Sequence, residues 1–444
     1  MRTPICDFVE KYSQSNAIRL HMPGHKGREL LGYEGLDITE IVGADSLYEA
    51  SGIIRESEQN VSSLFGCDTY YSTEGSSQCI RAMMYLVALY AAEKSEKPRV
   101  LVAKNCHKTF VSAVALLDID VRWLDVCGGY LSSKITCEDI EKTLAESPEK
   151  PHAVYLTSPD YLGRIADVKR IAEVCHRHGV LLCVDNAHGA YLRFLPESMH
   201  PIDLGADICC DSAHKTLPTL TGGAYLHISR DASSLFAKNA KEALALFGST
   251  SPSYLILQSL DKTNAYIADG YAEKLSDLTR KLSALKKRLR NAGYSFYGDE
   301  VTKFTLECKK YGYFGYEMAE ILGEKGIVCE FFDRDYLVLM FTTETGDGEL
   351  EKLEEALFSI EKRAPIFEKP PCAFISEKKM SIREATLSSC ELLPINECEG
   401  RILARLGVSC PPAVPIGIPG EVITREMIEA FKYFGTEKCA VIKK

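Results

Sequence analysis

Four short apolar runs, separated by segments with helical periodicity, constrain the fold of this chain more than any other feature. They are RVLVAKN (99–105), AVYLTSPD (153–160), VLLCVDNA (180–187) and ADICCDSAHK (206–215). Amphipathic segments such as ADVKRIAEVCHRHG (166–179) lie between them. An alternation of strands and helices is typical of a mostly parallel sheet with helices on both faces. We therefore predict an α/β fold with a mostly parallel central sheet.

Changes in composition divide the 444 residues into four predicted parts. These are an N-terminal arm (1–50), a large domain that contains the sheet (51–262), a smaller α+β domain (263–365) and a Pro- and Cys-rich C-terminal segment packed on the small domain (366–444). One long helix is expected over 263–290, and another closes the chain. A chain of this length usually has two or three domains.

Composition also narrows the class of partner. The formal net charge is -10, which argues against non-specific binding to nucleic acid. No apolar run is long enough to span a membrane, and the N-terminus MRTPICDFVEKYSQS lacks the apolar core of a secretory signal. The 17 cysteines are scattered without a C-x-x-C pair, which favours reduced thiols over a disulfide framework or a zinc site. We expect a cytoplasmic protein that acts on a small molecule and has no metal, membrane or nucleic-acid site.

Polar residues follow each of the four apolar runs. Because the carboxyl ends of parallel strands form the ligand site of an open sheet, we expect these residues to share one pocket. The candidates are His107 after the first run, Ser158 after the second, Asp185, Ala187 and His188 after the third, and Ser212, His214 and Lys215 after the fourth.

A further candidate site lies upstream, in STEGSSQCIRAMM (72–84). Gly75, Ser76 and Ser77 stand just before a strong helical segment. Small residues there leave backbone N–H groups open to an anion, and the helix dipole adds to the attraction. An ordinary Ser or Thr helix cap is the competing interpretation. The P-loop pattern G-x-x-x-x-G-K-[ST] does not occur, which disfavours a nucleoside triphosphate.

Lys215 requires a reason to stand at the end of a buried strand. A buried lysine costs several kcal/mol unless it is paired, neutralised or covalently used. An anion site, an aspartate at one strand end and a lysine after a later strand are together what pyridoxal 5'-phosphate requires. The lysine forms a Schiff base, and the aspartate keeps the pyridine nitrogen protonated. The residues therefore predict this cofactor.

Nine segments spread along nearly the whole chain carry a family resemblance. They are HMPGHKG (21–27), LDITEIVGADSL (36–47), TEGSSQCIRAM (73–83), NCHKTF (105–110), TSPDYLGRIADV (157–168), DNAHGAY (185–191), SAHKTLPTLTGGA (212–224), STSPSYLILQSLD (249–261) and PPAVPIGIPGEVIT (411–424). Together they resemble the fold-type I pyridoxal-phosphate enzymes of the ornithine/lysine/arginine decarboxylase group, in a compact biosynthetic form without a receiver-like N-terminal domain. The resemblance implies an aspartate-aminotransferase-like fold. It also implies decarboxylation of arginine, lysine or ornithine to the amine and CO2, as in polyamine biosynthesis.

The resemblance assigns a role to each candidate residue. It implies Lys215 as the lysine that carries the cofactor and Asp185 as the partner of the pyridine nitrogen. The other implied cofactor contacts are Gly75, Ser76, Ser77, Ser212 and His214 at the phosphate, His107 stacked on the ring, Ala187 beneath it, and Ser158 and His188 nearby. His214 and Lys215 are both candidate proton donors. Ser251, ahead of Ser253, is implied to reach the phosphate of a neighbouring subunit, so we expect a homodimer or a larger homo-oligomer with a shared site.

Two departures from the family pattern leave the substrate open. Gly222 and Gly223 stand where many members have glutamine and small polar residues, and Asn186 stands where many have glutamate. The acidic candidates for the distal cation of the substrate are unranked: Glu74, Asp160, Glu330 and Asp333.

Competing interpretations remain for the function and for single residues. An aminotransferase or a C–S or C–C lyase on the same fold is the nearer alternative, because Arg164 or Arg193 could grip a substrate carboxylate. A non-catalytic homologue is the more remote one. The structural interpretations are a surface lysine for Lys215, a core histidine for His107, a helix cap for Asp185 and an acid near a helix N-terminus for Glu421.

Overall fold

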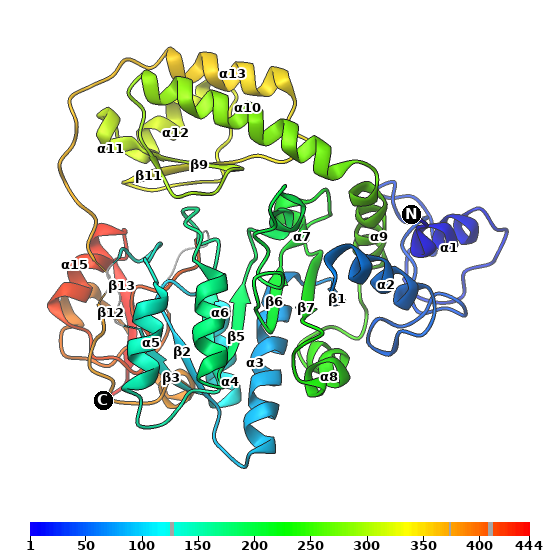
Figure 1. The fold of residues 1–444 in the computed structure, drawn as a ribbon, viewed down its shortest axis with the longest axis horizontal. Helices are drawn as coiled ribbons and strands as arrows, with labels where there is room; N and C mark the ends of the chain where they lie inside the picture. Colours follow the sequence, from blue (N-terminus) through cyan, green and yellow to red (C-terminus); the bar gives the residue numbers. More distant parts are fainter. Residues whose placement is uncertain (125–127, 373, 407–411) are drawn as a thin grey trace. The chain divides into compact units, whose positions relative to one another are not determined.

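A computed structural model of the chain describes residues 1–124, 128–372, 374–406 and 412–444 (Figure 1). It divides into two compact units. Unit 1 comprises Met1–Lys94 and Leu181–Leu275, and unit 2 comprises Ser95–Val180 and Ser276–Lys444. Among the described residues, none of the helices combines the length and the apolar character that crossing a bilayer requires. The first residue of the segment PPAVPIGIPGEVIT, position 411, lies outside the described residues.

Unit 1 contains four strands of the α/β sheet. They are β1 (Asp68–Ser72), β7 (Ala224–Ile228), β6 (Ile208–Asp211) and β5 (Leu181–Asp185). β7 pairs antiparallel with both β1 and β6, whereas β5 and β6 are parallel. Every residue of β5, β6 and β7 is buried, as expected for strands covered on both faces.

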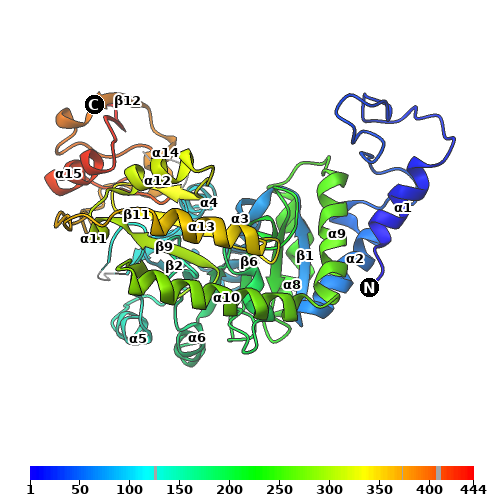
Figure 2. The ribbon, with the colours of Figure 1, turned by 90° about the horizontal axis from the view of Figure 1, so that it is seen from above.

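The helices of unit 1 cover these strands. α3 (Gly75–Glu93) packs on β6, β7 and α8 (Ser234–Ala245), and α2 (Ile53–Phe65) packs on β1 and α9 (Tyr254–Ala268). α1 (Pro4–Ser13) contacts α2 and α9, which places the N-terminal helix beside them in Figure 2. The short elements η1 (Leu47–Glu49), η2 (Ala190–Phe194) and α7 (Ala213–Thr216) complete the unit.

Unit 2 contributes a parallel group of three strands. β2 (Arg99–Val102) pairs in parallel with β3 (Asp120–Trp123) and β4 (Ala153–Thr157). The helices of this part are α4 (Lys108–Leu117), α5 (Cys137–Ala145) and α6 (Val168–Arg177). The parallel pairings in both units confirm the predicted α/β fold class. The four predicted strand runs correspond to β2, β4, β5 and β6.

A smaller α+β part of unit 2 is built on an antiparallel sheet in the order β10 (Phe331–Phe332), β11 (Tyr336–Met340), β9 (Lys303–Glu307) and β8 (Phe296–Tyr297). α10 (Tyr271–Asn291) and α13 (Asp347–Phe358) lie on one face of it (Figure 1). Leu282 and Leu289 of α10 share a core with Phe304 of β9 and Leu357 of α13. α11 (Cys308–Tyr311) and α12 (Gly315–Glu324) complete this part.

The C-terminal segment is a further small α/β element of unit 2. It consists of α14 (Ile382–Leu387), β12 (Cys390–Pro394), η3 (Ile395–Glu397), α15 (Arg425–Tyr433) and β13 (Lys438–Ile442). The helix predicted after PPAVPIGIPGEVIT is present as α15, and it is followed by β13, which pairs antiparallel with β12. No residue of β12 is buried, so it lacks the continuous buried run that marks β5, β6 and β7. The cysteines of the described residues are free thiols, and most are buried.

The single helix predicted over 263–290 is wrong. α9 ends at Ala268 and α10 begins at Tyr271. Gly270, between them, has a φ of +73°, a left-handed conformation that glycine adopts without strain and that interrupts a helix. The domain bounds proposed above stay a prediction.

Glu421 does not lie in the first turn of a helix, so that structural interpretation is wrong. α15 begins at Arg425 and is capped by the Thr424 side chain. Glu421 instead accepts a hydrogen bond from Lys104 Nζ at 2.6 Å and another from the Ile418 N–H at 3.0 Å. The side chains of Lys104 and Glu421 are only 4% and 3% exposed, so this is a buried ion pair.

Glu421→Gln is expected to lower the free energy of unfolding by about 3–5 kcal/mol, because Lys104 is left as a buried charge without a counterion. Urea unfolding followed by fluorescence measures the difference. The control is Lys104→Met combined with Glu421→Leu, which removes both charges and should be much closer to wild type. Equal stability of the wild type and the single variant would contradict a buried pair.

Candidate cofactor site

Lys215 lies in α7, directly after β6. Its Nζ is 3.0 Å from Nε2 of His188, which follows β5. An ammonium group only donates, so Nε2 of His188 accepts and its ring hydrogen lies on Nδ1. The sequence predicted a buried lysine, but Lys215 is only half-buried. His188 is buried, with 5% of its surface exposed. The lysine is therefore held at the end of the sheet with its amine within reach of a ligand.

Asp185 is the last residue of β5 and is 2% exposed. Its Oδ1 accepts from the Ala187 N–H at 3.2 Å and lies 3.8 Å from Cys210 Sγ. Ala187 is buried as well. The structure thus places a buried carboxylate three residues before the histidine that contacts Lys215. No helix begins here, so the capping interpretation of Asp185 does not hold.

The N-terminus of α3 meets the segment that carries Lys215. Ser212 Oγ donates to Ser76 Oγ at 2.8 Å, so two of the predicted phosphate hydroxyls are in contact. The N-cap residue is Glu74, whose side chain does not cap the helix and instead accepts from the Ser249 N–H at 2.5 Å. The predicted alternative of an ordinary Ser or Thr cap is therefore wrong. Hydroxyl groups and a helix N-terminus together are suited to bind a phosphate.

Two glycines shape this turn. Gly75 has a φ of +72°, and its N–H donates to the Gly222 carbonyl at 2.7 Å. Gly222 has a φ of +101°, and a Cβ there would lie 2.8 Å from the Thr73 carbonyl oxygen. A larger residue would push these backbones apart. Gly222, one of the two glycines that depart from the family pattern, is thus part of the wall of the candidate phosphate site.

His214 is held by the same loop. Its Nδ1 donates to the Gly223 carbonyl at 2.9 Å, and its backbone N–H donates to that carbonyl at 3.1 Å. Burial lowers the pKa of the imidazole, and the neighbouring Lys215 charge lowers it further. His214 is therefore neutral near pH 7, with its hydrogen on Nδ1.

His107 and Ser158 belong to unit 2. His107 is the N-cap of α4: its Nδ1 accepts from the Thr109 N–H at 3.2 Å and lies 2.8 Å from Thr109 Oγ1. Its ring is half-buried. Ser158 is 2% exposed, and its Oγ accepts from the Ala166 N–H at 3.0 Å. Each side chain therefore has a local role in its own loop, and a cofactor role for either stays a prediction.

Ser251 is exposed in the loop before α9. Its N–H donates to Ser249 Oγ at 3.1 Å, whereas Ser253 caps α9 by accepting from the Ile256 N–H at 3.4 Å. Of the two serines, Ser251 is therefore the one whose side chain is not used as a helix cap.

Asp160 follows β4 in unit 2 and is 2% exposed. It accepts hydrogen bonds from Ser132 Oγ and from the N–H groups of Leu162 and Arg164, at 3.1 and 2.9 Å for the two backbone donors. Burial nevertheless raises its pKa from the ordinary 3.8 to about 6. It lines a cavity of about 300 Å³ together with Arg164, Arg170 and Asp299.

Asp160→Asn is expected to stabilise the protein at pH 7.5 by about 2–3 kcal/mol relative to wild type, and the gain should vanish by about pH 4. The raised pKa means that the folded protein favours the protonated carboxyl. The protonated Asp160 therefore contributes its full stability to the wild type below pH 3.8, the pKa of the carboxyl in the unfolded chain. This contribution is lost as the pH rises through about 6, the pKa in the folded protein. Urea midpoints at both pH values measure the effect. A difference that does not change with pH would contradict it.

The other polar candidates are engaged elsewhere. Glu330 is exposed and accepts from Tyr161 OH at 3.3 Å, and burial raises the pKa of Asp333 to about 6. Arg164 donates to Tyr297 OH at 2.9 Å. Arg193 forms an ion pair with Asp203 at 2.6 Å, which weakens its case as a carboxylate-binding residue.

Comparisons with known proteins agree with this geometry. The model for the Orn/Lys/Arg decarboxylase major domain matches residues 3–304, and the model for the C-terminal domain of the same enzymes matches residues 363–440. The chain belongs to the Orn/Lys/Arg decarboxylase family. This membership confirms the predicted resemblance, the enzyme class and pyridoxal 5'-phosphate as the cofactor of that class.

The similarity to individual proteins spans the whole chain. Arginine decarboxylase of Bacillus subtilis (strain 168) is 28% identical over 96% of this chain and 92% of its own length. The uncharacterized protein YaaO of the same organism is 28% identical over 97% and 93%. The crystal structure of the Francisella novicida lysine decarboxylase LdcF superposes with a TM-score of 0.80 at 18% identity, over 99% of this chain and 81% of that one. The last comparison confirms the fold-type I architecture.

The residues of unit 1 fit the phosphate and pyridine ends of pyridoxal phosphate. The hydroxyls of Ser76 and Ser212 lie at a helix N-terminus beside Gly75, where a positive φ keeps the turn tight. The buried Asp185 carboxylate and the Lys215 amine supply the two remaining functional groups. Asn186, which the sequence marked only as a departure from the family pattern, forms a buried polar cluster with three residues that sequence reasoning missed: His200, Asp211 and His227. The two histidines are far apart in sequence and carry no motif.

Proposed function

We propose that this protein decarboxylates a basic amino acid, with arginine as the preferred substrate, to the corresponding amine and CO2. Family membership supports the reaction, and the arginine decarboxylase named above supports the substrate. The observation that carries the proposal is the placement of the Lys215 amine against His188, three residues after the buried Asp185.

Lys215 would hold the cofactor covalently through Nζ, and Asp185 would favour a positive charge on its ring nitrogen. The hydroxyls of Ser76 and Ser212 and the N-terminus of α3 would hold its phosphate. When bound, pyridoxal phosphate supplies the electron sink that accepts the electron pair of the breaking C–CO2 bond.

The residues differ in their capacity to return a proton to the substrate carbon. His214 is neutral near pH 7, and its one ring hydrogen is donated to the Gly223 carbonyl. Lys215 and His188 share a hydrogen bond of 3.0 Å through which a proton can pass. We therefore assign the proton donation to Lys215, with His188 holding the amine in place.

A second copy of the chain would complete the site. Ile18, Leu20, Leu30 and Leu31 of the N-terminal arm are more than four-fifths exposed, and Ser251 is exposed as well. Apolar side chains in such number favour a protein partner. We propose a homodimer in which Ser251 reaches the cofactor phosphate of the other subunit. The cytoplasmic location and the role in polyamine biosynthesis remain predictions from the sequence.

A substrate panel tests the proposal. The enzyme, loaded with pyridoxal phosphate, is incubated with arginine, lysine, ornithine and a non-basic amino acid, and released CO2 and keto acid are measured. We expect CO2 without keto acid, and a kcat/KM for arginine at least about tenfold above that for lysine. Keto acid as the main product would support an aminotransferase, and equal rates for all the amino acids would refute the substrate assignment.

A further inference from the structure

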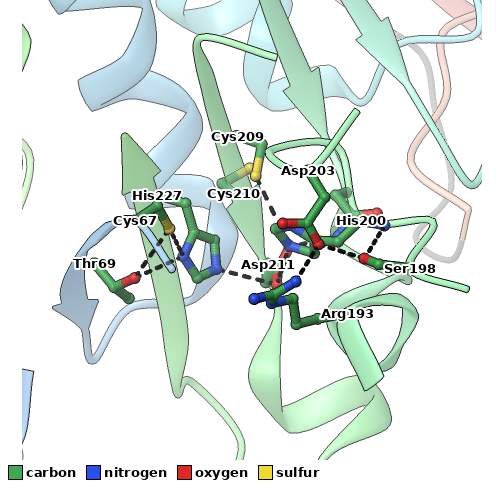
Figure 3. Close-up of polar contacts among 12 residues, drawn as sticks. Cys67, Thr69, Arg193, Ser198, His200, Asp203, Cys209, Cys210, Asp211 and His227 are labelled. Atoms are coloured by element: carbon green, nitrogen blue, oxygen red, sulfur yellow. Dashed lines mark hydrogen bonds and ion pairs between the residues drawn. The ribbon is translucent and has the colours of Figure 1, made fainter. Parts of the chain in front are cut away.

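Unit 1 also contains a buried polar cluster, and Figure 3 shows three of its members, His200, Asp211 and His227. We call it the Asp211 cluster; it consists of Asn186, His200, Asp211 and His227, all 0% exposed. Successive side chains of a strand point to opposite faces. Cys210 contacts Asp185, so Asp211 faces the other side of β6.

Both oxygens of the Asp211 carboxylate are used. Oδ2 lies 3.1 Å from His200 Nε2 and 3.1 Å from His227 Nε2, and Oδ1 accepts from Asn186 Nδ2 at 2.6 Å. A carboxylate only accepts, so each imidazole donates from Nε2. His227 Nδ1 is then free of hydrogen and accepts from Thr69 Oγ1 at 2.9 Å.

The cluster keeps Asp211 ionised. Burial by itself would raise the pKa of this carboxyl, but the two imidazoles and their hydrogen bonds hold the pKa well below its usual range. Burial also lowers the pKa of His227. The cluster is therefore a buried negative charge surrounded by three N–H donors, an arrangement that is costly to rearrange.

A metal ion is the competing occupant of this cluster. His200, Cys209 and Asp211 bring one potential ligand atom each to within 4.8 Å of one another. However, His200 already donates from Nε2 to the Asp211 carboxylate, so this nitrogen has no lone pair to offer a metal. The two Asp211 carboxylate oxygens already accept three hydrogen bonds, from His200, His227 and Asn186. These observations favour the hydrogen-bonded arrangement over a metal site.

The cluster joins the two chain segments that carry the candidate site. Asn186 directly follows Asp185, and Asp211 directly precedes the segment from Ser212 to Lys215. The hydrogen bond between the Asn186 and Asp211 side chains therefore connects the ends of β5 and β6. A backbone hydrogen bond from the Asn186 N–H to the Cys210 carbonyl, at 3.0 Å, lies beside it. His200 and His227 hold Asp211 from the opposite side.

We propose that Asp211 is a positioning residue. Anchored by His200 and His227, it fixes Asn186 and thereby the relative placement of Asp185 and Lys215 for the cofactor. This inference rests on the proposed function, because it concerns the same cofactor. It adds a network of residues that touches neither cofactor nor substrate and acts from behind the sheet.

The test measures the affinity of the apoprotein for pyridoxal phosphate by equilibrium dialysis. Asn186→Asp places a second carboxylate against Asp211, and we expect about 10–100-fold weaker binding, the range found when supporting partners of a bound group are changed. The loss relative to wild type should shrink at pH 5.5 compared with pH 8, because a proton shared by the two carboxyls restores the hydrogen bond.

Two further variants make the test specific. Asn186→Asp combined with Asp211→Asn exchanges the two groups, so that the new amide oxygen accepts from both histidines and its NH2 donates to the new carboxylate. Binding should return to within about threefold of wild type if the pair acts as a unit. Cys209→Ser tests the metal alternative instead, because Cys209 Sγ lies 4.0 Å from His200 Nε2 and is one of the three potential ligand atoms.

Each outcome decides the inference. Normal affinity in Asn186→Asp, no recovery in the exchanged variant, or a stoichiometric metal ion that is lost in Cys209→Ser would overturn it. If Asn186→Asp does not fold, the exchanged variant alone must bind the cofactor within threefold of wild type. Failure of the wild-type protein to bind pyridoxal phosphate would instead refute the proposed function.

Discussion

Lys215→Ala is expected to reduce CO2 release from arginine by more than about 10⁴-fold, because it removes the amine that bonds the cofactor and returns the proton. Nζ of Lys215 contacts His188, and His214 is neutral and hydrogen-bonded to the Gly223 carbonyl. Neither histidine can form the covalent link in its place. Initial rates of CO2 release from enzyme saturated with cofactor measure the loss.

The matched control for this variant is Lys238→Ala. Lys238 lies on α8 of the same unit and is exposed, so removal of its amine should leave the rate within about twofold of wild type. Retention of more than a tenth of the wild-type rate by Lys215→Ala would contradict the assigned role of Lys215.

Asp185→Asn should lower kcat by about 10²–10³-fold while the protein still folds and still holds the cofactor through Lys215. The amide oxygen can keep the hydrogen bond from the Ala187 N–H, so the change removes the charge and little else. Without that charge, the ring nitrogen is no longer favoured in its protonated form. Steady-state kinetics and cofactor content, measured together, separate the two effects.

Asp231→Asn is the control for Asp185→Asn, because Asp231 is exposed in the same unit and the substitution is chemically the same. Its kcat should equal that of wild type. An Asp185→Asn variant with normal kcat would show that this carboxylate does not face the cofactor ring.

The strands and the residues at their ends could be predicted because both depend on local sequence. β2, β4, β5 and β6 are continuous apolar runs, and the polar residues after them mark the ends of a parallel sheet. The contact between Lys215 and His188 follows from this rule, because β5 and β6 are neighbours.

Features that depend on tertiary contacts could not be predicted. The ion pair between Lys104 and Glu421 joins residues far apart in the chain. The Asp211 cluster combines a loop residue, two strands and the turn after β5, and only the fold brings these together. Gly270 stands within the helical pattern of the sequence, but a single glycine there does not by itself predict the left-handed conformation that ends the helix.

Reduction of the cofactor-loaded protein with borohydride, followed by peptide mapping, tests the central claim most directly. The account predicts a pyridoxyl group on a single peptide, attached to Lys215. A label on any other lysine, or no label on a protein that has been incubated with pyridoxal phosphate, would contradict it.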